Sequence, residues 1–490
     1  METTFLIIYF AALLVLAAFG TYGLVMVIYY LRLRPADPKP AREVALSRYP
    51  HVTVQLPLFN ELHVAERLVE AVCRLNYPME RLEIQILDDS TDSTTKVLAN
   101  LTRRKRRMGF NIHHIHRTNR QGFKAGALKE GLTTATGEFI AIFDADFVPE
   151  PEFLNQTIPH LLGDPQLGLV QARWEHINHD YSLLTRMQAM ALDAHFAMEQ
   201  QVRNRAKCFI NFNGTAGIWR KACILDAGNW ESDTLTEDLD LSYRAQLRGW
   251  RFLYLNDVTV PAELPAEING LKSQQFRWTK GAIETAKKHL LRVWFSRQPL
   301  RTKIHATVHL TSNIVFPFIL LVAILNVPMV FLKANNPELS SYFNLMSAFI
   351  FASISSFLFY LFAQRDIRTD WRNRMLLFPV FMAGTMGLAV NNTKAVIEAV
   401  INHRSAFNRT PKYNIRRRGD RAWQRSNYRY SKVSAATAIE VLLAGYFVFG
   451  IVASLSFREL AAIPFQLMYL FGFALTGFLS MRHAWVRNEG

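Results

Sequence analysis

The 490-residue sequence is poor in cysteine, and its three cysteines, Cys73, Cys208 and Cys223, have no metal-ligand spacing. A cytosolic location would keep them reduced, so we assign them no role. The sequence also lacks a nucleic-acid-binding signature, although its formal net charge is +16. We therefore expect no nucleic-acid partner, and we attribute the basic excess to loops that lie beside membrane-spanning helices and anionic lipid.

Charged residues are absent from the long apolar segment Phe5–Leu31. A helix needs about 20 apolar residues to cross a bilayer, and this segment exceeds that length. A secretory signal would be shorter and would have basic residues before it, whereas Arg32 and Arg34 follow this segment. The pattern predicts a retained transmembrane anchor whose carboxyl end, like everything up to Thr311, lies in the cytosol.

Four later segments also reach spanning length: Thr311–Leu332, Phe343–Ala363, Ser434–Phe457 and Ala461–Met481. A fifth, Met375–Val390, is shorter and contains Pro379, so we expect it to be interfacial or re-entrant. Basic residues concentrate in the connections that this arrangement places inside, which predicts five spans with the amino terminus outside.

Between His51 and Val260 the sequence alternates strand-like and helix-like segments, which predicts parallel strands covered by helices on both faces. Acidic turns follow two apolar strands: Asp88 and Asp89 follow "IQIL", and Asp144 and Asp146 follow "FIAIF". Ligands bind such sheets beyond the carboxyl ends of the strands. Asp144 and Asp146 are two residues apart, so they point to one side and can provide half of a Mg²⁺ site. The alternative is that these acids only cap the following helices.

A second acidic group lies in the segment 209–250, where the turn residues of "NFNGTAG" precede Glu237, Asp238 and Asp240. By itself this group is typical of an acidic first helical turn.

Four motifs occur in one order: "LDDS", "FDADF", "TEDLDL" and "QQFRW". This series resembles the D, D-x-D, T-E-D and Q-x-x-R-W motifs of processive family-2 glycosyltransferases, the cellulose and hyaluronan synthase group. "GFKAGALKEG", "NFNGTAGIWR" and "EDLDLSYRAQLRGW" are most similar to plant cellulose-synthase-like A and C proteins, which make β-mannan and β-glucan backbones. The resemblance covers residues 52–281 and, more loosely, the spans after them.

The resemblance implies a GT-A (Rossmann-like) α/β glycosyltransferase domain inserted between transmembrane helices. The expected organisation is an amino-terminal span (1–34), a cytosolic catalytic domain (50–270), an amphipathic interfacial helix (271–300), two spans (308–364), a cytosolic or interfacial segment (365–433) and two further spans (434–484). Because about 60 mostly apolar residues follow Arg429, we expect no carboxyl-terminal domain of the kind that senses a cyclic dinucleotide in bacterial cellulose synthase.

The same resemblance assigns roles to individual residues. Asp88 and Asp89 would hold the nucleoside of a sugar nucleotide, Lys124 and Arg277 would contact its diphosphate, and Asp144 and Asp146 would bind Mg²⁺ or Mn²⁺. Asp238, beside Glu237, would be the general base. Asn213, Gly214, Thr215 and Trp278 would hold the acceptor, and Gln274 belongs to the Q-x-x-R-W motif that binds the donor.

The segment Phe407–Lys412, "FNRTPK", resembles the F-x-V-T-x-K gating loop of cellulose synthases, with Arg409 in place of Val. Thr410 and Lys412 would then contact the diphosphate. An ordinary basic loop beside the membrane is the alternative.

These expectations describe an inverting β-glycosyltransferase of the inner (plasma) membrane with a cytosolic catalytic domain. It would move a hexose from UDP-glucose, the favoured donor, or GDP-mannose to a growing β-linked polysaccharide and pass the product through its own spans. One alternative is a non-processive enzyme with a lipid-linked acceptor. Another is a transporter or receptor with an inactive transferase domain, which the intact acidic motifs disfavour.

Overall fold

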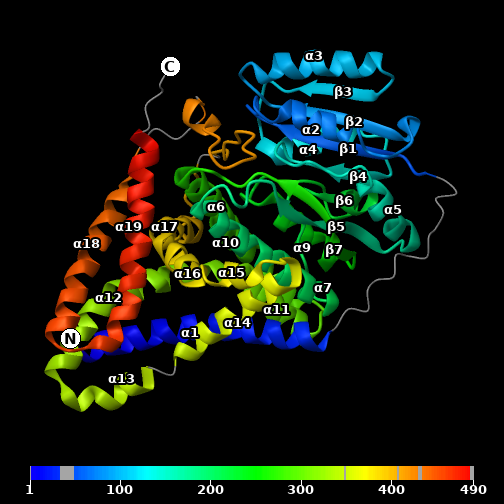
Figure 1. Ribbon diagram of the computed structural model, residues 1–490. Coiled ribbons are helices and arrows are strands. Elements are labelled where there is room, and N and C mark those ends of the chain that lie inside the picture. Colours follow the sequence, from blue (N-terminus) through cyan, green and yellow to red (C-terminus); the bar gives the residue numbers. More distant parts are fainter. Residues whose placement is uncertain are drawn as a thin grey trace.

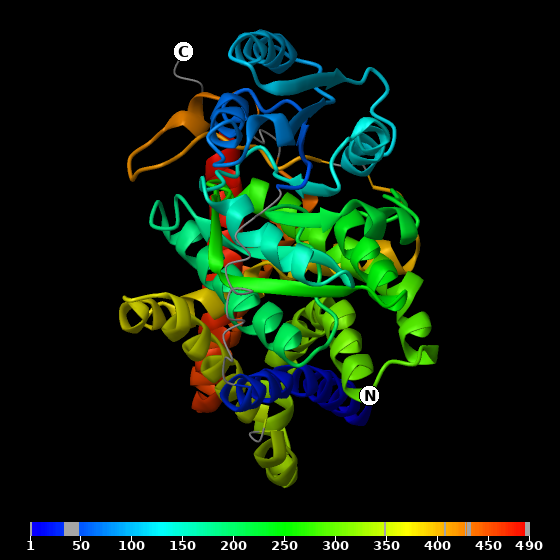
Figure 2. The ribbon, with the colours of Figure 1, turned by 90° about the vertical axis from the view of Figure 1, so that its right-hand side faces the viewer.

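The computed structural model describes residues 2–33, 49–346, 349–405, 408–426, 428 and 433–485. A sheet with its covering helices lies at one end of the molecule, and long apolar helices lie at the other (Figure 1). The same separation is visible after a quarter turn (Figure 2).

The described strands form one seven-stranded sheet in the order β3-β2-β1-β4-β6-β5-β7. Their bounds are β1 Val52–Leu58, β2 Leu82–Asp88, β3 Asn111–His116, β4 Phe139–Ile142, β5 Leu167–His176, β6 Gly217–Arg220 and β7 Arg251–Ala262. The first four strands pair in parallel, as the alternation of strands and helices predicts. The carboxyl ends of β1, β2 and β4 therefore lie along one edge.

Strand β6 departs from the all-parallel expectation, because it runs antiparallel to both β4 and β5. The cause is the turn that precedes it. The amide of Ala216 donates to the carbonyl of Ile142 at the end of β4 (2.9 Å), so the chain enters β6 at the carboxyl edge and leaves in the opposite direction. The sheet is mixed, and the "NFNGTAG" turn lies beside the acids that follow β4.

Helices cover both faces of the sheet. One face packs against α2 (Ala65–Val72), α3 (Thr94–Arg107) and α5 (Phe153–Gly163), and the other against α4 (Phe123–Thr134), α8 (Lys221–Asp226) and α9 (Glu237–Leu247). Between β5 and β6 the chain forms α6 (Leu183–Ala194), the π-helix η2 (His195–Gln200) and α7 (Gln201–Arg205). Helix α10 (Ile268–Phe295) follows β7 and runs between the sheet domain and the apolar helices (Figure 1).

The described residues contain five helices that are long and apolar enough to cross a membrane. They are Glu2–Arg32 (α1), Leu300–Asn335 (α11 Leu300–Thr311 and α12 Val315–Asn335), Pro337–Ile367 (α13 Ser340–Met346 and α14 Ile350–Ile367), Ala435–Ser456 (α18) and Leu460–Trp485 (with α19 Ile463–Trp485). The chain is therefore a membrane protein.

The segment Met375–Val390 contains no spanning helix. Its apolar part is α16 (Phe378–Gly387), preceded by α15 (Trp371–Met375) and followed by α17 (Ala389–Val400). Ten residues rise about 15 Å as a helix, roughly half of the hydrocarbon thickness. The start of α1, α13 and the junction of α18 with α19 lie on the side away from the sheet (Figure 1).

Candidate active site

A cavity of about 210 Å³ opens at the carboxyl edge of the sheet. Its lining comes from the ends of β1, β2, β4 and β7, the start of α9, helix α10 and the segment 409–412. The residues predicted from the sequence that line it are Asp89, Lys124, Asp144, Asp146, Asn213, Gly214, Glu237, Asp238, Gln274, Arg277, Trp278 and Lys412. Segments far apart in the sequence thus meet at one site.

Each carboxylate of the D-x-D motif is paired with a lysine from another segment. Lys124 Nζ lies 2.5 Å from Asp144 Oδ1 and 2.8 Å from the carbonyl oxygen of Gly214. Lys412 Nζ lies 2.7 Å from Asp146 Oδ2. Burial raises the pKa of Asp144, although the charge of Lys124 opposes the shift. Two carboxylates at a cavity wall, each requiring a cation, fit the half-site that Mg²⁺ or Mn²⁺ forms with substrate phosphates.

The carboxylate of Asp238 lies deep in the cavity beside the backbone of Gly214. Gly214 has φ +81°, and a Cβ there would lie 2.9 Å from Asp238 Oδ2, so glycine permits this close approach. Burial raises the pKa of Asp238 to about 7, and the neighbouring charge of Glu237 adds to the rise. A carboxylate with a pKa near neutrality is suited to act as a general base.

Asn213 and Thr215, two residues predicted to bind the acceptor, have different positions. Asn213 lines the cavity. Thr215 is fully buried, and its Oγ1 accepts a hydrogen bond from the amide of Asp144 (2.9 Å). Thr215 therefore holds the D-x-D turn rather than contacting a ligand, and the direct role expected for it is not supported.

The two acids of "LDDS" also differ. Asp88 is fully buried and contacts His114 Nε2 (2.9 Å) and His116 Nδ1 (3.2 Å) on the neighbouring strand β3. It does not line the cavity, so the direct nucleoside contact predicted for it is not supported. Asp89 does line the cavity, and Arg117 holds it in a bidentate pair, with Nε at 2.6 Å from Oδ1.

The segment 408–412 closes the cavity over α10. Arg277 donates to the carbonyl of Asn408 and, at 3.0 Å, to Thr410 Oγ1. Arg409, at the position where the gating-loop motif has Val, forms a 2.5 Å ion pair with Glu61 after β1. The first residue of the motif, Phe407, lies outside the described residues.

Sequence reasoning missed several lining residues, among them Glu61, Arg120, Trp174 and Glu263. Glu61 and Glu263 follow β1 and β7, so the rule that found Asp89 and Asp144, acids just beyond strand ends, would have found them as well. Trp174 lies 6.4 Å from Trp278, centroid to centroid, and carried no motif that marked it.

Helix α10 is tied both to the spans and to the helix that carries Asp238. Lys272 Nζ donates to Glu440 on α18 (2.6 Å) and to Ser480 on α19 (2.7 Å). At the other end, His289 Nε2 lies 2.7 Å from Asp240 on α9. The Q-x-x-R-W residues lie between these two ties, so their positions depend on both.

A second cavity, of about 350 Å³, extends from the active site among the apolar helices. The two cavities share seven lining residues: Trp174, Leu192, Asn213, Thr236, Asp238, Gln274 and Trp278. The far part of the second cavity is lined by Asn313 before α12, Phe316 of α12, Tyr360 of α14, Thr385 of α16 and Thr476 of α19. A space lined mainly by aliphatic and aromatic side chains, with hydroxyl and amide groups among them, thus adjoins the active site at Asp238 and reaches the spanning region.

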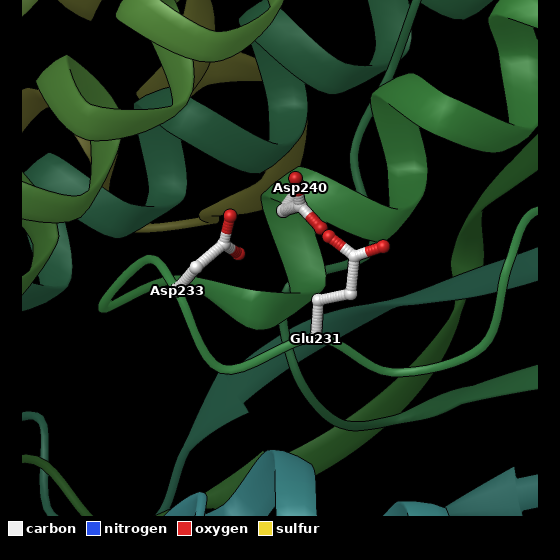
Figure 3. Close-up of side chains that lie close together, drawn as sticks. All are labelled: Glu231, Asp233 and Asp240. Atoms are coloured by element: carbon white, nitrogen blue, oxygen red, sulfur yellow. The ribbon is translucent and has the colours of Figure 1, made fainter.

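Figure 3 shows three further carboxylates that point toward one another: Glu231, Asp233 and Asp240, whose ligand atoms lie within 4.8 Å. Lys288 Nζ contacts all three, at 2.6 Å from Glu231, 2.7 Å from Asp233 and 2.8 Å from Asp240. Asp240 also pairs with Arg244 (2.7 Å) and His289. The ammonium of Lys288 thus already lies among all three carboxylates, at the place that a shared metal ion would have to take, whereas Asp144 and Asp146 are paired with two separate lysines at the cavity wall.

Comparison with known proteins agrees with this geometry. Residues 50–281 match the family described as "Glycosyltransferase like family 2". This part of the chain is a glycosyltransferase family 2 domain. The family 2 domain contains the whole sheet and all five acidic motif residues of the cavity, Asp89, Asp144, Asp146, Glu237 and Asp238, and the match ends within α10.

Curated relatives resemble the family 2 domain and part of its surroundings. The chain is 48% identical over 255 residues to "Glucomannan 4-beta-mannosyltransferase 2" of Arabidopsis thaliana, covering 51% of this chain and 48% of the relative. It is 45% identical over 274 residues to "Glucomannan 4-beta-mannosyltransferase 1" of Oryza sativa subsp. japonica, covering 54% and 53%. The chain thus spans about half the length of these relatives.

The fold of the family 2 domain is also found in a solved structure. This is "Mannosyltransferase PcManGT from Pyrobaculum calidifontis in complex with GDP-Man and Mn2+". The TM-score is 0.56 at 18% identity, and the match covers 80% of this chain and 99% of that chain. Together with the mixed sheet and the apolar helices on either side of it in the sequence, this shows a GT-A fold inserted into a membrane protein.

Proposed function

We propose that the protein is a processive β-mannan synthase, an inverting glycosyltransferase that adds mannosyl units to a β-linked polysaccharide and passes the product into its own spanning region. The observation that carries this proposal is that the two cavities adjoin and share Asp238 and Trp278 in their linings. A sugar added at the base has ahead of it a space lined by aromatic and aliphatic side chains together with hydroxyl and amide groups. An enzyme that acts once on a lipid acceptor would not need this space.

The donor assignment changes the preference drawn from the sequence. The sequence alone favours UDP-glucose as the donor. The curated relatives, however, are named as mannosyltransferases, and the solved structure of similar fold contains GDP-mannose. We therefore favour GDP-mannose. In the cavity, Lys124, Lys412 and Arg277 are cations placed to meet its diphosphate. A Mg²⁺ or Mn²⁺ ion held by Asp144 and Asp146 would neutralise the leaving diphosphate.

The chemical step is a single displacement. The acceptor hydroxyl oxygen bonds to the anomeric carbon, the bond from that carbon to the diphosphate oxygen breaks, and the hydroxyl proton passes to Asp238. Trp278 offers a face on which the acceptor sugar can stack. The nucleotide enters from the cytosolic side, where the catalytic domain lies in the predicted topology of a cell-membrane protein.

The deciding experiment supplies purified membranes with labelled GDP-mannose or UDP-glucose and measures product size and solubility. We expect a polymer labelled from GDP-mannose that β-mannanase degrades. A product that extracts into organic solvent with one or two sugars would instead support the lipid-acceptor enzyme. The absence of transfer from any nucleotide sugar, with intact nucleotide binding, would support a receptor or transporter.

The raised pKa of Asp238 predicts a pH dependence. A general base must be deprotonated, so protonation of Asp238 as the pH falls through about 7 removes the reactive form. We expect the rate at saturating donor to fall about tenfold for each pH unit below this value. Nucleotide binding measured over the same range separates this effect from loss of the donor. A rate that stays level down to pH 5 would contradict Asp238 as the base.

A further inference from the structure

The helix between β5 and β6 changes its winding at η2 (His195–Gln200), a π-helix enclosed by α6 and α7. In an α-helix, residues five apart point in directions that differ by roughly 140°. The wider π winding, with its i→i+5 hydrogen bonds, brings such residues to one side, and π segments are frequent at functional sites. In this protein the winding aligns His195 with Gln200.

Both of these side chains bind the same residue, Asn213. The ring nitrogen Nε2 of His195 lies 2.9 Å from Asn213 Nδ2, and Gln200 Nε2 donates to Asn213 Oδ1 at 2.6 Å. On its other side, His195 Nδ1 lies 2.8 Å from Glu199 Oε2. Because the carboxylate accepts the Nδ1 proton, Nε2 is left to accept from the Asn213 amide. The orientation of the Asn213 amide is therefore fixed at both ends.

The position of this group relates it to the acceptor. Asn213 lines both cavities, whereas His195 and Glu199 line only the second cavity, which continues into the spans. The side chain of Glu199 is 41% exposed; its Oε2 contacts His195 and lies 3.8 Å from Arg203, which leaves Oε1 to bind a ligand. A sugar that has already accepted a unit beside Asp238 has to lie on this side of the base.

We propose that His195, Glu199 and Asn213 form a binding subsite for the hydroxyl groups of the acceptor sugar, and that the π-helix is the element that presents it. The ligand class is a neutral β-linked hexose unit. Its hydroxyls both donate and accept hydrogen bonds, which matches a carboxylate beside an amide that has a second N–H. The inference rests on the proposed function and adds to it His195 and Glu199, which lie outside every motif found in the sequence.

The test uses the full-length protein, labelled GDP-mannose and β-1,4-linked manno-oligosaccharides as acceptors. For Glu199→Gln and His195→Phe we expect KM for the oligosaccharide to rise about tenfold or more, because each variant removes a hydrogen bond to or from a charged or oriented group. KM for GDP-mannose and the slow hydrolysis of GDP-mannose without acceptor should not change. Glu66→Gln, the same substitution at a side chain on the exposed side of α2, is the matched control and should leave all three quantities unchanged.

The possible outcomes separate the subsite from the proposed function. If the wild-type protein transfers sugar to oligosaccharides and both variants have the same acceptor KM as the wild type, the subsite is overturned and the proposed function is not. Equal losses of donor hydrolysis and transfer would also overturn it, since they indicate a structural role for η2. A wild-type protein that transfers sugar to no oligosaccharide, and makes no polymer, would overturn the proposed function and this inference with it.

Discussion

Asp238→Asn is expected to reduce sugar transfer by about 10²–10⁴-fold, the usual contribution of general-base catalysis. The amide is isosteric with the carboxylate and keeps an oxygen that can accept from the Leu239 amide, now 2.8 Å from Asp238 Oδ1, so the start of α9 should retain its shape. The amide cannot accept the proton of the acceptor hydroxyl at neutral pH. Release of nucleotide and incorporation of label, measured together, quantify the loss.

Binding of GDP-mannose should remain close to the wild-type value in Asp238→Asn, because the cations that meet the diphosphate are on other segments. Asp233→Asn is the matched control, since it makes the same substitution in the loop before α9 at a side chain that is 55% exposed and lies outside both cavities. We expect it to be fully active. Retention of more than about one tenth of the transfer rate in Asp238→Asn would mean that another group is the base.

Asp146→Asn is expected to have the second large effect, a fall in metal-dependent transfer on the order of 10²-fold or more. The reason is that charge stabilisation by a bound metal is worth several kcal/mol, and each ~1.4 kcal/mol is a tenfold change in rate. Chelation of divalent ions should abolish wild-type transfer, and Mn²⁺ or Mg²⁺ should restore it. Titration of Mn²⁺ by electron paramagnetic resonance, with GDP present, provides a readout that does not depend on turnover.

Two acidic groups compete in this experiment, and the variants distinguish them. Asp146→Asn should weaken Mn²⁺ binding, whereas Asp233→Asn, in the group that Lys288 occupies, should leave Mn²⁺ binding unchanged. The opposite result would place the metal among Glu231, Asp233 and Asp240, and it would contradict the assignment to the D-x-D motif.

The convergence of the acidic turns could be predicted from the sequence, because alternating strands and helices place strand ends along one edge. This reasoning placed Asp144 and Asp146 at the cavity, whereas Asp238, at the start of α9, was assigned to the site only through the resemblance to processive family-2 glycosyltransferases. It could not separate Asp88 from Asp89. Consecutive residues at a strand end point to opposite sides, and only the pairing of β2 with β3 shows that the two histidines of β3 engage Asp88.

Other features depend on tertiary contacts that leave no local pattern. The antiparallel direction of β6 is set by the turn in which the amide of Ala216 binds the carbonyl of Ile142. The sequence around Ala216 has no feature that distinguishes this strand from a parallel one. The π winding at His195–Gln200 could not be recognised in the hydrophobic pattern of the sequence, because it adds only one residue to a single helical turn. That α16 is shorter than a spanning helix, by contrast, could be predicted from the length of the apolar segment Met375–Val390 and from its Pro379.

Helix α10 is a continuous helix of 28 residues. It carries the Q-x-x-R-W side chains between its contact with Glu440 of α18 and its contact with Asp240 of α9. A continuous helix cannot shift at one end without moving the rest. A tilt of the last two spans, which contact α10 through Glu440, would therefore also move the segment 408–412, which α10 contacts at Thr410, and helix α9, which it contacts at Asp240. In the proposed synthase, advance of the product within the bilayer and admission of the next donor would therefore be mechanically coupled, because a single helix contacts both regions.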